Sequence, residues 1–368
     1  MARSTARRPA SKKLRVAFVG GGMIAGAHID ALRQMDDVEI VAVCDVKAPV
    51  LKQKKEKYGF SDDMLFTDPA KMLRSVKPDA VNVCTPNGAH AKNTIDALKA
   101  GAHVIVEKPM AMSAKECKDM IAAAKKARRK LVIGFQYRYE PRTQMFKQAA
   151  DEGVFGDILF GRVQALRRRG IPNWGVFGQK KLQGGGPMID IGVHVLEMTH
   201  YVMGSPKPIA ATGMTHTYIG DKKDKTKVVS MWPGWDYKTY TVEDLAVGHI
   251  RFDNGAVIHI EAMFAGHIEK DVWDFQLMGT KGGCTWSDPK IFTDELGHMV
   301  NIQPAHLAGN WHAGGFNRFF EVKNRNFVDH VLYNKPTMAP AEHGLMVQQM
   351  LDAVYASAAK GGQEVKIT

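Results

Sequence analysis

The sequence predicts an α/β protein of two domains, in which a doubly wound parallel sheet is followed by an α+β domain with a large, open, mostly antiparallel sheet. Three observations lead to this fold class. At 368 residues the chain is long for a single hydrophobic core. In the first third, short apolar runs alternate with amphipathic stretches, as in a parallel sheet covered on both faces. Longer runs of alternating polar and apolar residues follow, which indicate half-buried strands.

The first domain is expected over residues 14–137. Its predicted strands are Leu14–Val19, Val38–Cys44, Ala80–Thr85, Val104–Glu107 and Leu131–Phe135, with helices between them. Residues 1–13 carry basic side chains but no apolar stretch, so we expect a flexible basic arm rather than a secretory signal.

The second domain is expected over residues 138–368. Its predicted strands are Ile158–Arg168, Tyr240–Phe252, Ala256–Phe264 and Trp273–Met278, and its predicted helices are Arg142–Glu152, Pro187–Met203, Arg318–Tyr333 and Glu342–Lys360. Asp253-Asn254-Gly255 stands between two strand patterns and predicts a tight hairpin, because these residues tolerate positive φ.

Composition and spacing argue against several partners. The net charge of +12 comes from dispersed basic residues without a nucleic-acid-binding motif, so we expect no nucleic acid partner. No apolar run approaches the roughly 20 residues of a membrane-spanning helix, so no membrane span is expected. The four cysteines form no CxxC pair and the histidines lack metal-ligand spacing. We therefore expect no metal site and a reducing cytoplasm.

A glycine-rich turn follows the first predicted strand and opens a helix. In Gly20-Gly21-Gly22-Met23-Ile24-Ala25, Gly20 permits a tight turn, while Gly22, Met23 and Ile24 bring backbone to a pyrophosphate at the helix N-terminus. Asp45 ends the second predicted strand, where a carboxylate can bind both ribose hydroxyls and repel a 2′-phosphate. The expected cofactor is NAD; nearby Lys47 leaves NADP as the less favoured alternative.

Three further segments carry a family resemblance: Asp79–His90 (DAVNVCTPNGAH), Gly101–Met110 (GAHVIVEKPM) and Gly184–His194 (GGGPMIDIGVH). With the glycine turn, they make the chain resemble the Gfo/Idh/MocA family, the glucose-fructose oxidoreductase and inositol dehydrogenase group, from about residue 14 to the C-terminus. The resemblance implies a Rossmann first domain and an oxidoreductase that acts on sugars, inositols or related carbohydrates.

The resemblance also implies site residues. Those expected in the cofactor groove or near the nicotinamide are Thr85, Pro86, Asn87, His90, Glu107, Lys108 and Gln136. Lys108, Asp190 and His194 are the expected catalytic and substrate-binding residues, and Arg138 is a further substrate-binding candidate. Gln136-Tyr137-Arg138-Tyr139 departs from the Asn-Arg-Arg run of many members.

The catalytic candidates suit alcohol oxidation, which needs a base for the hydroxyl proton while a hydride leaves the carbon. Asp190 and His194 are four residues apart, so a helix over this segment would project both from one face. We expect His194 to be the general base, Asp190 to orient it or a substrate hydroxyl, and Lys108 to stabilise the developing alkoxide.

A glycine- and aromatic-rich loop, residues 170–178, precedes the catalytic segment. Trp174 or Phe177 is expected to stack on the apolar face of a sugar ring, and the run Arg167 to Arg169 to bind substrate hydroxyls or an acidic group. A packed loop with a solvated basic run is the alternative. Trp311 and His312 form a second candidate wall.

Other functions remain open from the sequence. The fold can retain NAD for a redox-neutral glycosidase or epimerising reaction, reduce an imine, enone or keto-sugar, or act as a nucleotide-binding sensor. The open sheet is expected to have a face without helices, which predicts a homodimer or homotetramer formed through that sheet.

Overall fold

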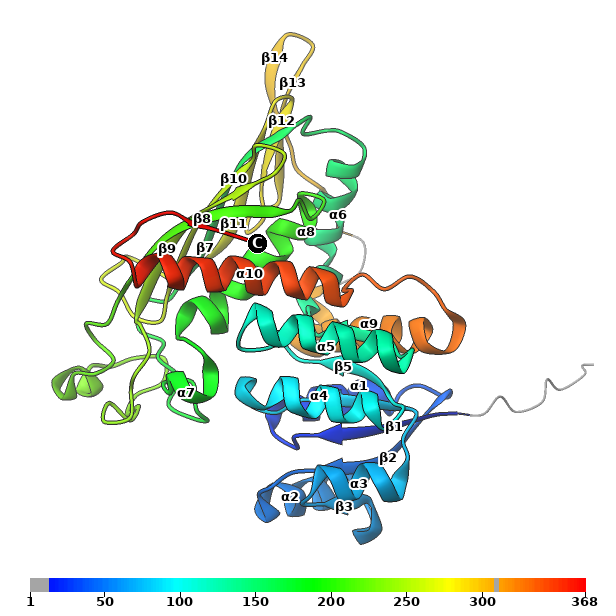
Figure 1. Cartoon of the computed structure of the whole chain (residues 1–368). Helices are drawn as coiled ribbons and strands as arrows, with labels where there is room; N and C mark the ends of the chain where they lie inside the picture. The colour runs from blue at the N-terminus through cyan, green and yellow to red at the C-terminus, as the bar shows by residue number, and fades with distance from the viewer. Residues whose placement is uncertain (1–12, 308–310) are drawn as a thin grey trace, which may run out of the picture.

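The computed structural model describes residues 13–307 and 311–368. The predicted basic arm, residues 1–13, falls almost entirely outside this part of the chain. Two sheets stand one above the other, with the N-terminal sheet below and the C-terminal sheet above (Figure 1). In the described residues, no helix is long and apolar enough to cross a membrane.

The lower sheet is parallel throughout, with strand order β3-β2-β1-β4-β5-β6. Its strands are β1 Leu14–Val19, β2 Val38–Cys44, β3 Leu65–Phe66, β4 Ala80–Val83, β5 His103–Val106 and β6 Leu131–Ile133. The connecting helices are α1 Met23–Leu32, α2 Ala48–Tyr58, α3 Pro69–Val76, α4 His90–Lys99 and α5 Ala114–Ala127, with short η1 Asp62–Met64 and η2 Asn87–Ala89. The strand order reverses between β1 and β4, where an open α/β sheet leaves a ligand crevice.

The upper sheet has the order β14-β13-β12-β11-β7-β10-β9-β8-β15 and is antiparallel except between β7 and β10. Its strands are β7 Ile158–Leu166, β8 Pro208–His216, β9 Leu245–Phe252, β10 Val257–Met263, β11 Val272–Gly279, β12 Gly282–Thr285, β13 Lys290–Glu295, β14 His298–Ile302 and β15 Val365–Lys366. The predicted hairpin joins β9 to β10, and Gly255 has the positive φ of 86° that its turn requires.

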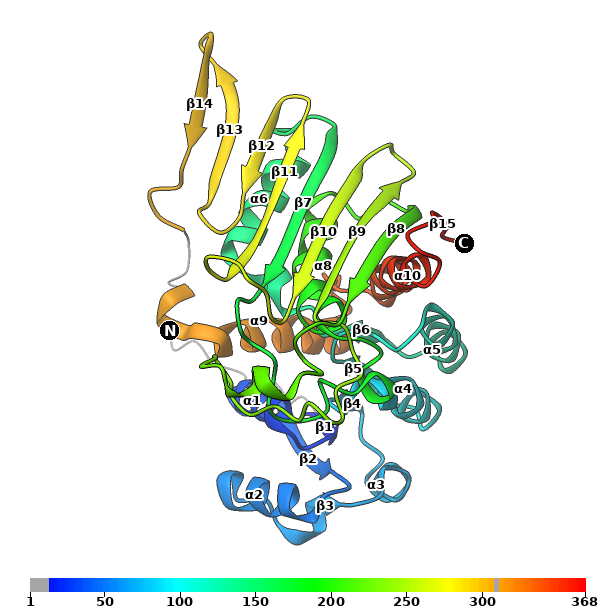
Figure 2. The ribbon, with the colours of Figure 1, turned by 90° about the vertical axis from the view of Figure 1, so that its left-hand side faces the viewer.

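Helices cover one face of the upper sheet and connect it to the lower domain (Figure 2). The helices of this domain are α6 Pro141–Asp151, α7 Lys180–Gln183, α8 Val193–Val202, α9 Trp311–Tyr333 and α10 Ala341–Ala358, with η3 Gln136–Tyr139, η4 Met188–Gly192 and η5 Lys223–Lys227. Of these, α8 and α10 pack directly on the sheet. Late in the chain, α9 returns to pack against α1, where Arg325 pairs with Asp37 at 2.8 Å. Helix α10 packs on both β8 and α5. These contacts hold the second domain against the first.

The fold class is confirmed, and some elements differ in detail. The predicted helix Pro187–Met203 is a π-helical turn, η4, followed by α8. The pattern did not indicate β3, β8 or β12 to β15. Strands β3, β12 and β15 have two to four residues, and β13 and β14 carry exposed polar side chains, so they lack the alternation expected of a half-buried strand. Strand β8 has nine residues, and its sequence PIAATGMTH alternates weakly because small and apolar residues stand on both faces.

Candidate active site

The glycine turn between β1 and α1 lies against the end of β4. Gly20 has φ of 93°, and a Cβ there would meet the Cys84 carbonyl oxygen at 2.5 Å, so any other residue would force the strands apart. The Gly20 amide also donates to the Cys44 carbonyl at 2.8 Å. Backbone contacts therefore hold the turn at the crevice.

The N-terminus of α1 faces open space. A Cβ built on Gly22 has no neighbouring atom within 4 Å, and no side chain caps the helix. Met23, the first helical residue, is 77% exposed, while the next residue, Ile24, packs partly against the core. Free amides, a helix dipole and room at Gly22 fit a pyrophosphate, so this turn can hold a dinucleotide.

Asp45 is placed beside the turn by two backbone hydrogen bonds. Its Oδ2 accepts from the Gly21 amide at 2.8 Å, and its Oδ1 accepts from the Lys47 amide at 2.9 Å. Each carboxylate oxygen retains acceptor capacity, because an ionised carboxylate offers about four lone-pair sites. The geometry fits the ribose-binding role predicted for this residue.

The loop after β4 joins the two domains. The side-chain amide of Asn87 donates to the Gln183 carbonyl at 3.0 Å. His90 is 1% exposed, and its Nε2 and Nδ1 lie 2.8 Å from the carbonyl oxygens of Thr85 and Pro109. His90 thus connects the two loops that border the crevice, and burial lowers its pKa. Its contacts are to protein backbone, so it positions the loops around Thr85 and Pro86 rather than facing the groove.

Lys108 and Asp190 meet across the domain boundary. The Lys108 Nζ donates to the Asp190 carbonyl oxygen at 2.7 Å and lies 3.3 Å from its Oδ1. Both side chains are 15% exposed, so the pair is shielded but open on one side. A cation held in this way can still donate hydrogen bonds to a substrate oxygen, since an ammonium has three protons.

His194 lies in an aromatic wall next to this pair. Its ring is 5.0 Å from that of Tyr137 and 5.9 Å from that of Trp273. Burial, followed by the charge of Lys108, lowers the pKa of His194 well below its usual value. Its Nδ1 has no hydrogen-bond partner among the described residues. The imidazole is therefore neutral near pH 7 and able to take a proton.

Close backbone packing supports the segment that carries Asp190 and His194. Both carboxylate oxygens of buried Glu243 accept from the Gly186 amide at 3.0 Å, and its Oε1 accepts from the Tyr355 hydroxyl at 2.7 Å. A Cβ on Gly192 would lie 2.9 Å from Ala262 Cβ. The π-helical turn replaces the predicted α-helical spacing, as is frequent at functional sites. Sequence reasoning missed Glu243 and Tyr355, because no local pattern marks them.

Glu107 belongs to a buried polar cluster. Its Oε1 lies 2.8 Å from His28 Nε2 and 2.7 Å from the Nζ of Lys323, which is 0% exposed. Asn324 and Asn82 contact the other nitrogen of His28, both at 3.0 Å. Burial alone raises the pKa of Glu107, but Lys323 and His28 outweigh it and hold this pKa below its usual value. Glu107 therefore anchors the loop before Lys108 instead of facing solvent.

Arg138 requires a correction. It was a substrate-binding candidate, yet it is 0% exposed, donates to Glu197 at 2.6 Å and to the Met338 carbonyl at 2.6 Å, and stacks between Phe135 and Tyr201. A guanidinium with all its surface covered by protein cannot touch a substrate.

Gln136 was expected near the nicotinamide, and Trp311 and His312 were expected to form a second wall of the site. Gln136 is 2% exposed, and its Oε1 has no partner among the described residues, so the structure gives it little surface toward a cofactor. The side chains of Trp311 and His312 lie outside the described residues.

Arg167 and Trp174 lie together in an aromatic cluster. Trp232 has its ring 4.6 Å from that of Trp174 and 4.8 Å from the Arg167 guanidinium carbon. Burial lowers the pKa of Arg167, and the carboxylate of Asp190 opposes this shift, which places Arg167 in the field of the Lys108–Asp190 pair. Trp232 and Tyr137 are members of the site that the sequence patterns did not reveal.

Both domains match models of a known protein family. Residues 14–135 match the GFO_IDH_MocA family model, an oxidoreductase family with an NAD-binding Rossmann fold, and residues 147–367 match its C-terminal alpha/beta domain. D-glucoside 3-dehydrogenase of Escherichia coli (strain K12) is 38% identical, over 95% of this chain and 97% of that protein. Levoglucosan dehydrogenase of Pseudarthrobacter phenanthrenivorans is 28% identical, over 75% and 74% of the two chains.

Solved structures show the same architecture. Levoglucosan dehydrogenase in complex with NADH and levoglucosan superposes with a TM-score of 0.81 at 24% identity, covering 97% of this chain and 100% of that one. Both halves of the chain, in this order, match the two family models. The chain belongs to the Gfo/Idh/MocA oxidoreductase family.

Proposed function

We propose that the protein is an NAD-dependent dehydrogenase that moves a hydride between the nicotinamide and a ring hydroxyl or keto carbon of a sugar, glycoside or cyclic polyol. The observation that carries this proposal is the contact of Lys108 with Asp190, because it brings a cation from the nucleotide-binding domain to an anion from the other domain. The relative from Escherichia coli is a D-glucoside 3-dehydrogenase, which supports a glucoside as the substrate.

NAD, when bound at the β1–α1 turn, supplies the hydride acceptor or donor. The chain supplies the rest. Lys108 donates a hydrogen bond to the reacting substrate oxygen and stabilises its developing negative charge. His194 takes the hydroxyl proton during oxidation and returns it during reduction. Asp190 holds the Lys108 ammonium in place, and Tyr137 and Trp273 keep water from the imidazole.

The preference for NAD over NADP follows from Asp45. Its carboxylate is fixed by the Gly21 and Lys47 amides at the end of β2. Such a carboxylate accepts hydrogen bonds from two ribose hydroxyls and repels a 2′-phosphate. Titration with both nucleotides, followed by protein fluorescence, tests this preference, and equal affinity for NADP would refute it.

A homo-oligomer formed through the upper sheet is also part of this proposal. Gly213 faces Val354 of α10, and Leu277 lies on the face that packs against Thr199 of α8. Because side chains alternate along a strand, the following residues Met214 (39% exposed) and Met278 (49% exposed) lie on the opposite face. Apolar side chains on a helix-free face favour burial against a second copy. Light scattering after size exclusion should give a multiple of the chain mass, and a monomer would refute this part.

Absorbance at about 340 nm tests the reaction itself across glucosides, free aldoses, inositols and sugar acids. We expect NADH formation with one carbohydrate class, and none from a Lys108→Ala variant. Tight NAD binding without net NADH formation would instead favour a redox-neutral reaction or a sensor. Absence of dinucleotide binding would refute the proposal at its first step.

A further inference from the structure

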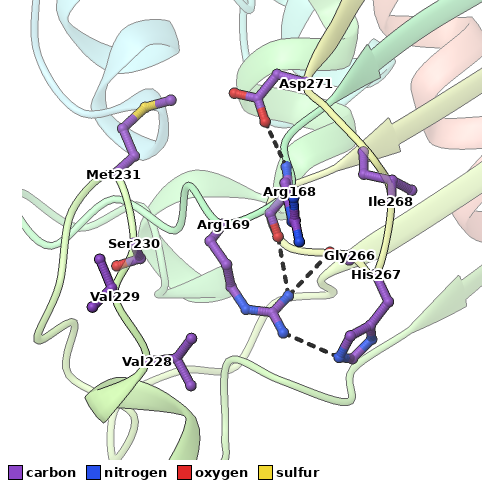
Figure 3. A pocket seen from close by; sticks show the side chains of 10 residues that line it. All are labelled: Arg168, Arg169, Val228, Val229, Ser230, Met231, Gly266, His267, Ile268 and Asp271. Atoms are coloured by element: carbon purple, nitrogen blue, oxygen red, sulfur yellow. Dashed lines mark hydrogen bonds between the residues drawn. The ribbon is translucent and has the colours of Figure 1, made fainter.

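A cavity of about 720 Å³ opens at the end of β7, outside the group formed by Lys108, Asp190 and His194. Figure 3 shows its walls, which come from residues 168–169, from residues 266–271 after β10, and from the segment 228–231. Its volume lies in the range of small-molecule sites. Nothing in the proposed reaction uses it.

The chemistry of the walls favours an anion. In the described part of the chain, neither Arg168 nor Arg169 forms an ion pair with a carboxylate. The Arg169 guanidinium donates to the Gly266 carbonyl at 3.1 Å and lies 3.2 Å from His267 Nε2, while that of Arg168 donates to the Glu269 carbonyl at 3.0 Å. Among the described residues, two guanidinium groups thus line the cavity without an ion pair to a carboxylate.

Two of the residues that line the cavity carry a buried polar atom without a hydrogen-bond partner among the described residues, and a third carries a carboxylate. The Arg169 Nε and the Ser230 Oγ are buried without a hydrogen-bond partner among the described residues. Buried polar atoms of this kind are rare unless water or a ligand satisfies them. Asp271 is the single carboxylate of the lining, and its Oδ1 accepts from the Arg168 amide at 2.7 Å. The cavity therefore keeps a positive balance.

The rim is apolar and exposed. Val229 is 92% exposed, Met231 is 51% exposed and Val228 is 41% exposed, and all three line the cavity. Exposed apolar side chains next to unpaired cations suit a ligand with an apolar body and an anionic group.

The cavity adjoins the proposed substrate site through two chain segments. Arg167 lies in the field of Asp190, whereas its neighbours Arg168 and Arg169 line the cavity. In the second segment, Met231 lines the cavity while Trp232 stacks on Arg167. A ligand with two linked groups could therefore occupy both places.

We propose that this cavity is an outer subsite for an aglycone, specifically an apolar group that bears a carboxylate, on a glycoside whose sugar ring is oxidised beside Lys108. The carboxylate pairs with Arg169 and Arg168, and the apolar body lies against Val228 and Met231. This inference rests on the proposed function, because only a glycoside presents a sugar and an aglycone together.

A matched pair of glucosides provides the first test. The kcat/KM for 4-carboxyphenyl glucoside should exceed that for phenyl glucoside by about tenfold, since a charge-assisted hydrogen bond is gained. Arg169→Gln should bring this ratio close to one. The control Arg251→Gln removes an exposed arginine that pairs with Glu364. Arg251 lies beside the start of β10, whereas the cavity lies beyond its end, so the ratio should stay unchanged. A wild-type ratio near one, or a ratio unaffected by Arg169→Gln, would overturn the proposal.

Binding of the free aglycone separates this inference from the proposed function. Quenching of tryptophan fluorescence by 4-hydroxybenzoate, with phenol as the neutral control, reports on Trp232 and does not require turnover. Saturable quenching by the acid that Arg169→Gln abolishes supports the subsite even if no glucoside is oxidised. No quenching, equal quenching by phenol, or a change of oligomeric mass in Arg169→Gln would overturn it, the last by assigning the cavity to a contact between copies.

Discussion

Two cation–carboxylate pairs join helix α8 and its preceding turn to the rest of the molecule, and they differ in exposure. Lys108 and Asp190 are each 15% exposed and bridge the crevice. Arg138 and Glu197 are both 0% exposed, and Arg138 is covered further by Phe135 and Tyr201. Both cations were substrate-binding candidates from the sequence, yet only one of them has a face that a ligand can reach.

The difference in exposure separates an ion pair that a substrate can reach from one that only holds the fold together. A buried pair contributes little net stability but is costly to break, because a lone charge would remain in the core. A partly open pair keeps unused hydrogen-bonding capacity and can change partners when a substrate arrives. We therefore expect loss of Lys108 to affect turnover and loss of Arg138 to affect folding.

Lys108→Ala and His194→Asn are expected to have the largest effects. The first of them is Lys108→Ala. Turnover with the best carbohydrate should fall about 10²- to 10³-fold or more, the range for loss of a preorganised donor at a developing oxyanion. The melting temperature should change little, because the pair is partly solvated. The control Lys115→Ala removes an exposed lysine paired with Asp119 and should leave both quantities unchanged. Unfolding of Lys108→Ala at the temperature of the assay would contradict the assignment of Lys108 to turnover rather than to folding.

His194→Asn should lower turnover about 10²- to 10⁴-fold, as expected for loss of a general base. In the wild type, burial and Lys108 lower the pKa of His194 below the usual 6.5. The neutral base therefore persists to acid pH, and the acid limb of kcat/KM for oxidation should lie below 6.5. If the acid limb of kcat/KM lay above pH 6.5 and did not change in His194→Asn, another group would take the proton.

Arg138→Met should reduce the free energy of unfolding by about 3–5 kcal/mol. Burial raises the pKa of Glu197 to about 7 despite the opposing Arg138 charge, so removal of Arg138 raises it further. A raised carboxyl pKa in the folded state makes stability fall as pH rises through it. The loss should thus be larger at about pH 8 than at about pH 6, as denaturant titrations can measure. A pH-independent loss would show that Glu197 is not the cause.

The smallest effect is expected at the ribose end of the crevice. Asp45→Ser should weaken NAD binding about 10- to 100-fold, since hydrogen bonds to a charged group are lost, and should narrow the preference over NADP. Asp63→Ser changes an exposed carboxylate of the same domain and serves as the control. Unaltered nucleotide selectivity in Asp45→Ser would place ribose recognition elsewhere.

Much of the first domain could be predicted from sequence for a physical reason. Strands β1 and β2 have the bounds that their apolar runs predicted, because a central parallel strand is buried on both faces. The Gly20 turn was predictable because its positive φ requires glycine. Burial of a strand on both faces and a positive φ each restrict the residue types at their own positions, so both can be recognised in the sequence.

The residues that hold the site in place from distant parts of the chain leave no local pattern in the sequence. Lys323 reaches Glu107 from a position 216 residues later in the chain, and Tyr355 reaches Glu243 across 112 residues. Arg138 was misassigned for the same reason, because its partner Glu197 is 59 residues away and burial arises only on folding. Pairings set by tertiary packing cannot be deduced from spacing along one sequence.

Direct hydride transfer is the central claim, and a labelled substrate tests it. The protein would be incubated with NAD and a glucoside that carries deuterium at each ring carbon bearing a hydroxyl, and the nucleotide product examined by mass spectrometry. We expect NADH that has gained one deuterium, formed by the wild type and by Lys115→Ala but not measurably by Lys108→Ala. Unlabelled NADH, or labelled NADH formed equally by Lys108→Ala, would contradict it.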